Sequence, residues 1–215
     1  MHPTHQEQFW AGSFGDEYVA RNTGDALVAA NLKLFSHVLA RTGPIRSLIE
    51  FGANIGNNLR AISQLVPQCR LAAVEINATA VAKLTEHLPQ AEIHHTSVLD
   101  FTPTGTFDVA LTKGVLIHMA PETLPQVYDT LYAASARYLV VCEYYSPTPQ
   151  EVLYRGHEHK LFKRDFAGEL MDRHGDLELV DYGFSYRRDP VFPQDDLTWF
   201  VLEKRPAGAP GAPPA

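Results

Sequence analysis

The segment from Glu50 to Asn57 combines a carboxylate, two glycines and two asparagines around one turn. It follows a short apolar run at 47–51 and precedes a helix-like run at 59–66. A strand that enters a helix through a glycine turn leaves a crevice lined by backbone N–H groups. Gly52 and Gly56 let a ligand approach the backbone, because they have no Cβ. The turn predicts a site for a nucleotide-like ligand; the alternative is a turn that only joins strand to helix.

The spacing of the glycines distinguishes between two nucleotide-type ligands. A dinucleotide fingerprint reads G-x-G-x-x-G and requires glycines at positions 54 and 57. Those positions hold Asn54 and Asn57, so the glycine that lets the backbone approach a pyrophosphate is missing. Glu50, just before the turn, is not needed by a dinucleotide and can accept a hydrogen bond from an ammonium group. The pattern therefore favours a ligand that carries an amine over NAD.

A second carboxylate, Glu75, ends the apolar run 71–75. It lies about 20 residues beyond the glycine turn, the offset of a carboxylate that binds ribose hydroxyls at the end of the second strand. The alternative is a surface carboxylate that the dipole of the next helix stabilises. Asn77 is expected to be the N-cap of that helix, over 78–88.

Two side chains are candidates for a general base. His118 follows a predicted strand, 107–112, and open α/β sheets bind ligands beyond the carboxyl ends of their strands. His118 could therefore take a proton from a hydroxyl or an amine. The alternative is a partly buried histidine that packs or bonds a backbone carbonyl. Tyr144, at the end of a predicted strand over 137–145, is the second candidate.

Strands and helices alternate through most of the chain. Further elements are a predicted strand over 93–98 and a predicted helix over 124–134. This alternation predicts an α/β fold, a parallel sheet with helices on both faces. The last two predicted strands, 177–187 and 197–204, have no helix pattern between them, so we expect an antiparallel pair.

Composition indicates a single cytoplasmic domain. The 215 residues are enough for one sizeable core, and no apolar run approaches the roughly 20 residues of a membrane span. The net charge of −7 disfavours nonspecific binding to nucleic acid or to an anionic membrane. We predict one domain over 1–206 with an N-terminal helical lid at about 7–40. The Pro/Ala/Gly tail, 207–215, is expected to be disordered.

Several blocks of the sequence resemble known enzymes. The run Glu50-Phe-Gly-Ala-Asn-Ile-Gly56 resembles the first motif of the class I S-adenosylmethionine-dependent methyltransferases. Over about residues 7–204 the chain resembles the pseudaminic acid biosynthesis-associated methylases. The blocks that carry this second resemblance are 9–22, 143–147, 154–166, 181–184 and 195–200.

The resemblance implies a Rossmann-like, mostly parallel seven-stranded sheet with an antiparallel C-terminal strand pair. It implies S-adenosylmethionine as cofactor and an association with a bacterial nonulosonic acid sugar made for surface or flagellar glycosylation. The methyl acceptor is left open. A sugar acid or a nucleotide sugar is the acceptor that this association suggests.

Cofactor contacts are implied for residues at the ends of the first four strands. They are Glu50, Gly52, Ala53, Asn54, Gly56, Asn57, Glu75, Ile76, Ser97, Val98, Lys113 and Gly114. Many such enzymes hold the adenine amino group with an Asp after the third strand, where this chain has Ser97. A serine hydroxyl can accept from that amino group, and the Val98 N–H can donate to a ring nitrogen. Asp100 is either a further cofactor contact or a turn residue.

Basic residues gather at 155–164 of an otherwise acidic chain. They are Arg155, His157, His159, Lys160, Lys163 and Arg164. This reversal of charge fits an anionic acceptor; the alternative is a solvated loop before a helix over 164–173. We expect Arg155 and His157, with Tyr144, to bind the acceptor, and Arg21 to bind a carboxylate through its guanidinium. Histidines at i and i+2 without a cysteine do not suggest a metal site.

The sequence is also compatible with two other functions. One is a methyltransferase for a different small molecule, such as a carboxylate, an amine or a phenol. The other is a noncatalytic nucleotide-binding module, against which the polar and aromatic residues around Tyr144 and Arg155 argue. The oligomeric state does not follow from the sequence.

Overall fold

The structure, a computed structural model, describes residues 4–22 and 24–205, so the tail predicted at 207–215 lies outside the described residues. The helices are α1 His5–Ala11, α2 Ser13–Arg21, α3 Asp25–Thr42, α4 Asn57–Leu65, α5 Ala78–His87, α6 Leu124–Ala134 and α7 Phe166–Arg173, with short 3-10 helices η1 Leu116–His118 and η2 Pro121–Thr123. The strands are β1 Ser47–Phe51, β2 Arg70–Glu75, β3 Glu92–His95, β4 Phe107–Lys113, β5 Ser135–Glu143, β6 Gln150–Glu151, β7 Phe162–Lys163, β8 Leu177–Ser185 and β9 Leu197–Lys204.

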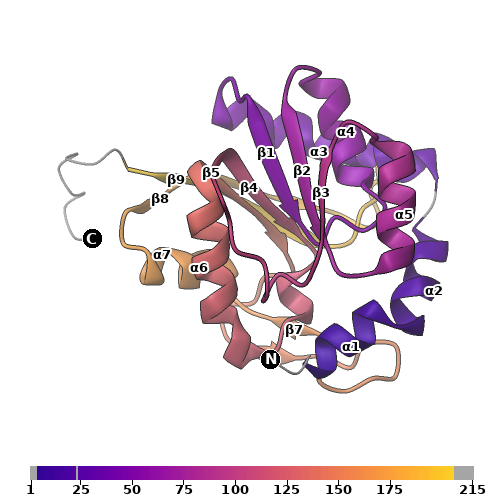
Figure 1. The fold of residues 1–215 in the computed structure, drawn as a ribbon. Coiled ribbons are helices and arrows are strands. Elements are labelled where there is room, and N and C mark those ends of the chain that lie inside the picture. Colours follow the sequence, from indigo (N-terminus) through magenta and orange to yellow (C-terminus); the bar gives the residue numbers. More distant parts are fainter. Residues whose placement is uncertain (1–3, 23, 206–215) are drawn as a thin grey trace.

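Seven strands form one sheet in the order β3-β2-β1-β4-β5-β9-β8 (Figure 1). The pairs between β3 and β5 are parallel, and β9 runs antiparallel to both β5 and β8. The predicted mostly parallel sheet with an antiparallel C-terminal pair is confirmed. Because β1 lies between β2 and β4, the chain reverses its direction of progress across the sheet at β1 and β4, where open sheets bind ligands.

Helices cover both faces of the sheet, as the alternation predicts. Helices α3, α4 and α5 pack on one face through Phe35, Ile62 and Leu84. Helices α6 and α7 pack on the other through Leu131 and Leu170. Strands buried on both faces read as continuous apolar runs, which explains why 48–51 and 71–74 lack an alternating pattern. Within 4–22 and 24–205, no helix has the length and hydropathy of a membrane span.

Several predicted boundaries need correction. β3 ends at His95 and not at 98, because the chain turns at Ser97, whose carbonyl accepts from Asp100 and Phe101 N–H groups. β5 runs from Ser135 to Glu143, two residues earlier than predicted at each end. The small antiparallel pair β6–β7 was not predicted; its two-residue strands are too short for a periodic signal.

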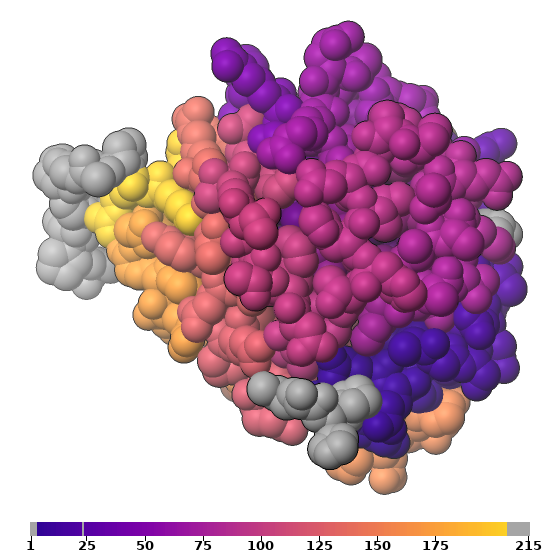
Figure 2. All heavy atoms as spheres, in the orientation of Figure 1, coloured from indigo at the N-terminus to yellow at the C-terminus, as the bar shows by residue number. Residues whose placement is uncertain are grey.

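The predicted lid at 7–40 contains two kinds of helix. The last of its helices, α3, belongs to the core, with Val28, Phe35 and Val38 buried against the sheet layer. The first two, α1 and α2, lie beside the carboxyl ends of the strands and next to the insert, residues 154–164 (Figure 1). Figure 2 shows the indigo N-terminal helices against the orange insert at one corner of the molecule. We call α1 and α2 the lid helices below.

Candidate functional site

A cavity of about 640 Å³ opens at the carboxyl ends of the central strands. Most of the predicted cofactor residues line it: Gly52, Ala53, Asn54, Asn57, Glu75, Ile76, Ser97, Val98, Lys113 and Gly114. The lid helices add Glu7, Trp10 and Tyr18 to the same cavity. The structure therefore brings together the ends of four strands and one face of the lid.

The glycine turn after β1 has the backbone that its sequence requires. Gly52 has a φ of 70°, and a Cβ there would collide with Val115. Gly56 has a φ of 82°, and a Cβ there would collide with Leu84. Gly56 does not line the cavity, so in this structure it serves helix packing and not ligand approach. Both positions favour glycine because L-residues rarely adopt such φ values.

Glu50 lies beneath the cavity and not in its wall. Its carboxylate is fully buried, and Oε1 accepts from Asn58 Nδ2 at 2.5 Å. Burial raises the pKa of Glu50 to about 8, although Asn58 and Lys113 partly offset this. Among the described residues Oε2 has no partner. Because Glu50 does not line the cavity, it does not offer the predicted direct contact with an ammonium group in this structure. Asn58 and Lys113 line the cavity instead.

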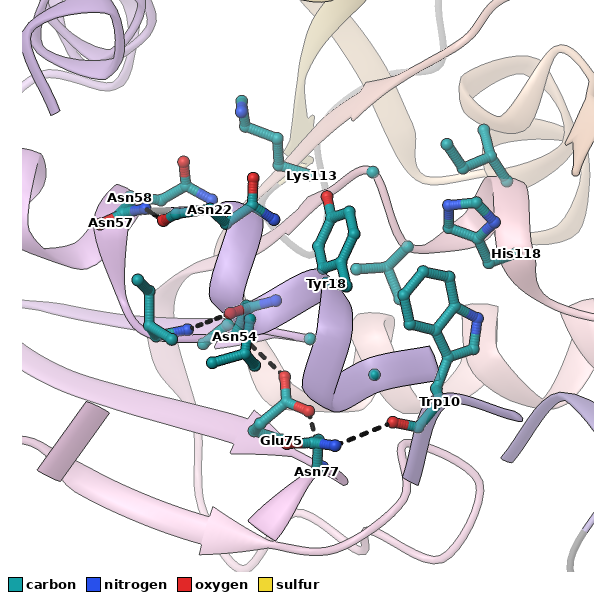
Figure 3. A pocket seen from close by; sticks show the side chains of 18 of the residues that line it. Trp10, Tyr18, Asn22, Asn54, Asn57, Asn58, Glu75, Asn77, Lys113 and His118 are labelled. Atoms are coloured by element: carbon teal, nitrogen blue, oxygen red, sulfur yellow. Dashed lines mark hydrogen bonds between the residues drawn. The ribbon is translucent and has the colours of Figure 1, made fainter. Parts of the chain in front are cut away.

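Glu75 reaches the cavity from the end of β2. Its Oε2 accepts from Asn54 N at 2.7 Å and its Oε1 from Asn77 N at 2.8 Å (Figure 3). Burial raises the pKa of Glu75, against the effect of these hydrogen bonds. Each carboxylate oxygen keeps a lone pair for a further donor. Asn77 caps α5 as predicted, by accepting from Ala80 N at 2.8 Å, and it also donates to Trp10 O at 3.2 Å.

His118 has features of both roles considered for it: it lies at the cavity like a general base, and it bonds a backbone carbonyl like a structural histidine. It lines the cavity, and its Nδ1 lies 2.6 Å from the Lys160 carbonyl oxygen. A carbonyl only accepts, so Nδ1 carries the proton and Nε2 is left as an acceptor. Burial lowers the pKa of His118 to about 4, so the ring is neutral at pH 7. The ring centroids of Trp10 and Tyr154 lie 4.6 and 4.9 Å from that of His118.

Glu143, at the end of β5, holds the segment that carries His118. Its Oε1 accepts from the Thr112 hydroxyl at 3.0 Å, from Val115 N at 3.0 Å and from Leu116 N at 3.1 Å. Burial raises the pKa of Glu143 to about 7. Sequence reasoning missed this residue, although a glutamate that ends an apolar strand is the same signal that identified Glu75.

A group of neighbouring polar side chains from four segments forms another part of the cavity wall. They are Tyr18, Tyr144, Tyr154, Arg155 and Asp195. Burial and the neighbouring Asp195 carboxylate hold the pKa of Tyr144 well above its usual range. Tyr144 is therefore a neutral phenol at pH 7, which suits it to donate a hydrogen bond and not to serve as the base considered above. Asp195 comes from the loop between β8 and β9. It begins the block 195–200 that carries part of the resemblance, but it was not predicted as a site residue.

The insert contributes less positive charge to the cavity than its sequence suggests. Of its six basic side chains, all of them described, Arg155 is the one that lines the cavity. His157 lies outside it and packs against Phe9, with ring centroids 5.1 Å apart. The other basic groups meet local partners: His159 meets Glu151, Arg164 meets Glu169, Lys160 meets His5, and Lys163 lies over the Tyr144 ring.

Arg21 and Asp100 were also considered as site residues from the sequence. Arg21 lines the cavity at its rim, with a guanidinium 5.6 Å from the Phe14 ring centroid and 3.6 Å from the Glu17 carboxylate. Asp100 is exposed and does not line the cavity, which supports its interpretation as a turn residue. Within the described ranges, no three His, Cys, Asp or Glu side chains are grouped to hold a metal ion.

Comparisons with known proteins agree with this arrangement. Residues 49–137 match the family model described as a methyltransferase domain. The matched range begins in β1 and ends in β5, so it contains the glycine turn, Glu75, Ser97 and His118. A comparison with curated protein sequences gives no match.

Several solved structures that resemble the chain are methyltransferases. One is the 1,6-didemethyltoxoflavin N1-methyltransferase of Burkholderia thailandensis, with S-adenosylhomocysteine bound, at a TM-score of 0.69 and 16% identity over 95% of this chain and 91% of that one. The fold is that of the class I methyltransferases. The magnesium protoporphyrin IX methyltransferase of Synechocystis shares this class I methyltransferase fold at a TM-score of 0.67 and 11% identity, over 95% and 100% of the two chains. A plantazolicin methyltransferase has the same fold, at a TM-score of 0.64 and 15% identity over 93% of this chain and 95% of that one.

Proposed function

We propose that this chain is an S-adenosylmethionine-dependent methyltransferase for a small molecule. One observation carries the proposal. The Glu75 carboxylate lies at the tip of β2 beside the Gly52–Asn54 turn, in a cavity that polar side chains of α2, the insert and the β8–β9 loop also line. A nucleoside fits the first group of residues, and an acceptor fits the second. The residues 1–206 form one domain in this proposal, and the lid helices cover the cofactor.

The residues present fit this cofactor at each of its parts. Glu75 has lone pairs for the ribose hydroxyls, and Gly52 lets the ligand approach the backbone. Lys113 and Asn58 line the wall near Glu50 and suit a carboxylate and an amine. Trp10 Nε1 is buried at the cavity without a partner among the described residues, so its N–H is available to a ligand.

The protein has to position the acceptor against the methyl group of the cofactor. Where the acceptor carries a proton, the protein also has to remove it. When bound, the cofactor supplies a methyl group on a sulfonium, which the acceptor nitrogen or oxygen attacks in line. The lid helices and the insert exclude water around that path, which strengthens the polar contacts within it. His118 Nε2 faces this step as a neutral acceptor and can take the acceptor proton.

The acceptor that we propose is a pseudaminic-acid-type or related sugar, free or as a nucleotide sugar, methylated in the cytoplasm. Arg155 and Arg21 at the cavity can bind its anionic groups. Tyr18, Tyr144 and Asp195 can bind hydroxyl or amine groups. Incubation with S-adenosylmethionine and a panel of sugar acids, nucleotide sugars, amines and phenols tests this, with mass spectrometry to detect one added methyl group. Methylation of phenols alone would overturn the sugar acceptor and leave the enzyme class standing.

The cofactor assignment predicts a measurable loss at Glu75. Titration calorimetry should show S-adenosylhomocysteine binding and no comparable binding of NAD. Glu75→Ala should weaken S-adenosylhomocysteine by roughly 1–3 kcal/mol, because the ribose hydroxyls lose a charged acceptor. Glu86→Gln, an exposed change on α5, is the control and should bind as the unaltered protein does. Tight NAD binding without S-adenosylhomocysteine binding would contradict the assignment.

The acceptor assignment predicts a selective effect at Arg155. Arg155→Ala should raise the acceptor KM about 10-fold or more, as expected for the loss of one charged hydrogen bond, and leave the cofactor KM nearly unchanged. Arg164→Ala removes a basic residue of the same insert that pairs with Glu169 outside the cavity, and it should leave both KM values unchanged. Equal losses for both ligands in Arg155→Ala would mean that this residue supports the structure of the cavity.

A further inference from the structure

The order of the strands fixes where the nucleobase lies, given the proposed cofactor. Glu75, at the end of β2, takes the ribose, and the reacting end points to β4 and His118. β2 lies between β1 and β3 in the sheet, so the base extends the opposite way, past the end of β3. The cavity wall there is Ser97 and Val98, both buried. Neither side chain carries the negative charge that would favour an exocyclic amino group.

A carboxylate from outside the sheet reaches this place. Glu7, on the lid helix α1, lines the cavity, and the Ser97 hydroxyl hydrogen-bonds to its carboxylate. Ser97 Oγ also accepts from Leu99 N at 3.1 Å, so its proton is free to point at Glu7. Burial raises the pKa of Glu7, but the hydrogen bonds from Ser97 and Thr4 outweigh this and lower it. Glu7 is therefore ionised at neutral pH.

We propose that Glu7 of the lid helix reads the 6-amino group of the adenine, in partnership with Ser97. The proposal rests on the proposed cofactor. A carboxylate has about four lone-pair sites. Glu7 uses one for Thr4 N, at 2.6 Å from Oε2, and one for Ser97, so sites remain for an N–H of the base. The lid helix then recognises the cofactor directly, and an adenine is preferred over a base with an oxygen at position 6.

The same carboxylate also holds the start of the helix. Glu7 is the N3 residue of a capping box, in which Thr4 Oγ1 accepts from Glu7 N at 3.1 Å. Glutamine supports a capping box as well as glutamate does. In Glu7→Gln the single amide oxygen can serve Thr4 N, and the NH2 group then faces Ser97 and the base. This variant keeps the helix cap and reverses the hydrogen-bonding character at position 6.

The test compares two ligands on two proteins by titration calorimetry. The ligands are S-adenosylhomocysteine and S-inosylhomocysteine, which differ at position 6 by an amino group and a carbonyl. The unaltered protein should prefer the adenosyl ligand by roughly 10–100-fold, as expected for a charge-assisted hydrogen bond. Glu7→Gln should reduce this preference at least 10-fold, because its NH2 group can donate to the carbonyl. Glu17→Gln, an exposed change on α2, is the matched control and should keep the full preference.

The possible results separate the proposed role of Glu7 from the proposed function of the protein. A full preference for the adenosyl ligand in Glu7→Gln overturns the role of Glu7, and so does equal binding of both ligands by the unaltered protein. In either case the proposed cofactor stands. Failure of the unaltered protein to bind either ligand overturns the proposed function as well. A melting temperature for Glu7→Gln within a few degrees of the unaltered protein shows that a changed preference does not come from loss of the helix.

Discussion

Replacement of His118 by asparagine is expected to lower kcat by about 10²–10⁴-fold, if His118 removes the acceptor proton. The asparagine amide N–H can take over the hydrogen bond from Nδ1 to the Lys160 carbonyl, whereas nothing replaces Nε2. The melting temperature should therefore fall by only about 2–4 °C, equivalent to roughly 1 kcal/mol. Initial rates at saturating ligands and thermal denaturation measure the two effects.

His87→Asn is the matched control for this change. His87 also bonds a main-chain carbonyl, that of Ile55 at 2.9 Å from Nδ1, but it does not line the cavity. The kcat of His87→Asn should equal that of the unaltered enzyme. Because burial lowers the pKa of His118 to about 4, the unaltered enzyme should keep its base form down to about pH 5. An unchanged kcat in His118→Asn would show that the histidine only packs and bonds the carbonyl.

Replacement of Glu143 by alanine should have the largest effect on stability. It leaves the Thr112 hydroxyl and the Val115 and Leu116 N–H groups without their acceptor in a buried place. We expect a loss of roughly 3–5 kcal/mol in the free energy of unfolding, and a melting temperature lower by about 6–20 °C. The matched variant Glu143→Gln keeps one oxygen at the Oε1 position, where all three of these donors converge, so it should lose far less.

The same carboxyl group gives stability a pH dependence. Burial raises the folded pKa of Glu143 to about 7, above its ordinary value, so its contribution is complete below pH 4.5 and is lost as the pH rises through 7. Glu50, with a pKa of about 8, acts in the same direction. His118, with a lowered pKa, acts in the opposite direction, but only below about pH 6.5.

Burial also raises the pKa of Glu75, so the pH interval from 6.5 to 8 reports the buried carboxyl groups of Glu143, Glu50 and Glu75 together, without His118. The melting temperature of the unaltered protein should fall across this interval, and Glu143→Gln should show a smaller fall. A melting temperature that rises from pH 6.5 to 8 in the unaltered protein would contradict the raised pKa values.

The sheet and the part of the cavity proposed to hold the cofactor were predictable from the sequence because their signals are local. A buried parallel strand is a continuous apolar run, and a glycine turn or a terminal carboxylate lies within a few residues of it. Gly52, Glu75 and Asn77 therefore lie where the spacing predicts. Glu50 shows the limit of this reasoning: the sequence identifies the carboxylate but not the amide of Asn58 that separates it from the cavity.

The part of the cavity proposed to bind the acceptor was less predictable because it depends on contacts between distant segments. The charge of the insert suggested an anion site, but most of its basic groups meet partners that only the folded chain supplies, such as Glu169 for Arg164. His157 was expected at the acceptor and instead packs on the Phe9 ring. Conversely, neither Glu7 nor Asp195 was predicted as a site residue; they reach the cavity from a helix and a loop that are remote in sequence from the carboxyl ends of the central strands.

This division of the cavity has a consequence for how such a protein can evolve. The groups proposed to hold the cofactor come from turns that the sheet itself builds, so changing them endangers the fold. Apart from Tyr144 at the end of β5, the groups proposed to bind the acceptor come from the lid helices, the insert and the β8–β9 loop, which the sheet does not need. Acceptor preference can therefore drift while the core stays fixed. Glu7 is the exception, because on our proposal it ties one of the variable segments to the constant ligand.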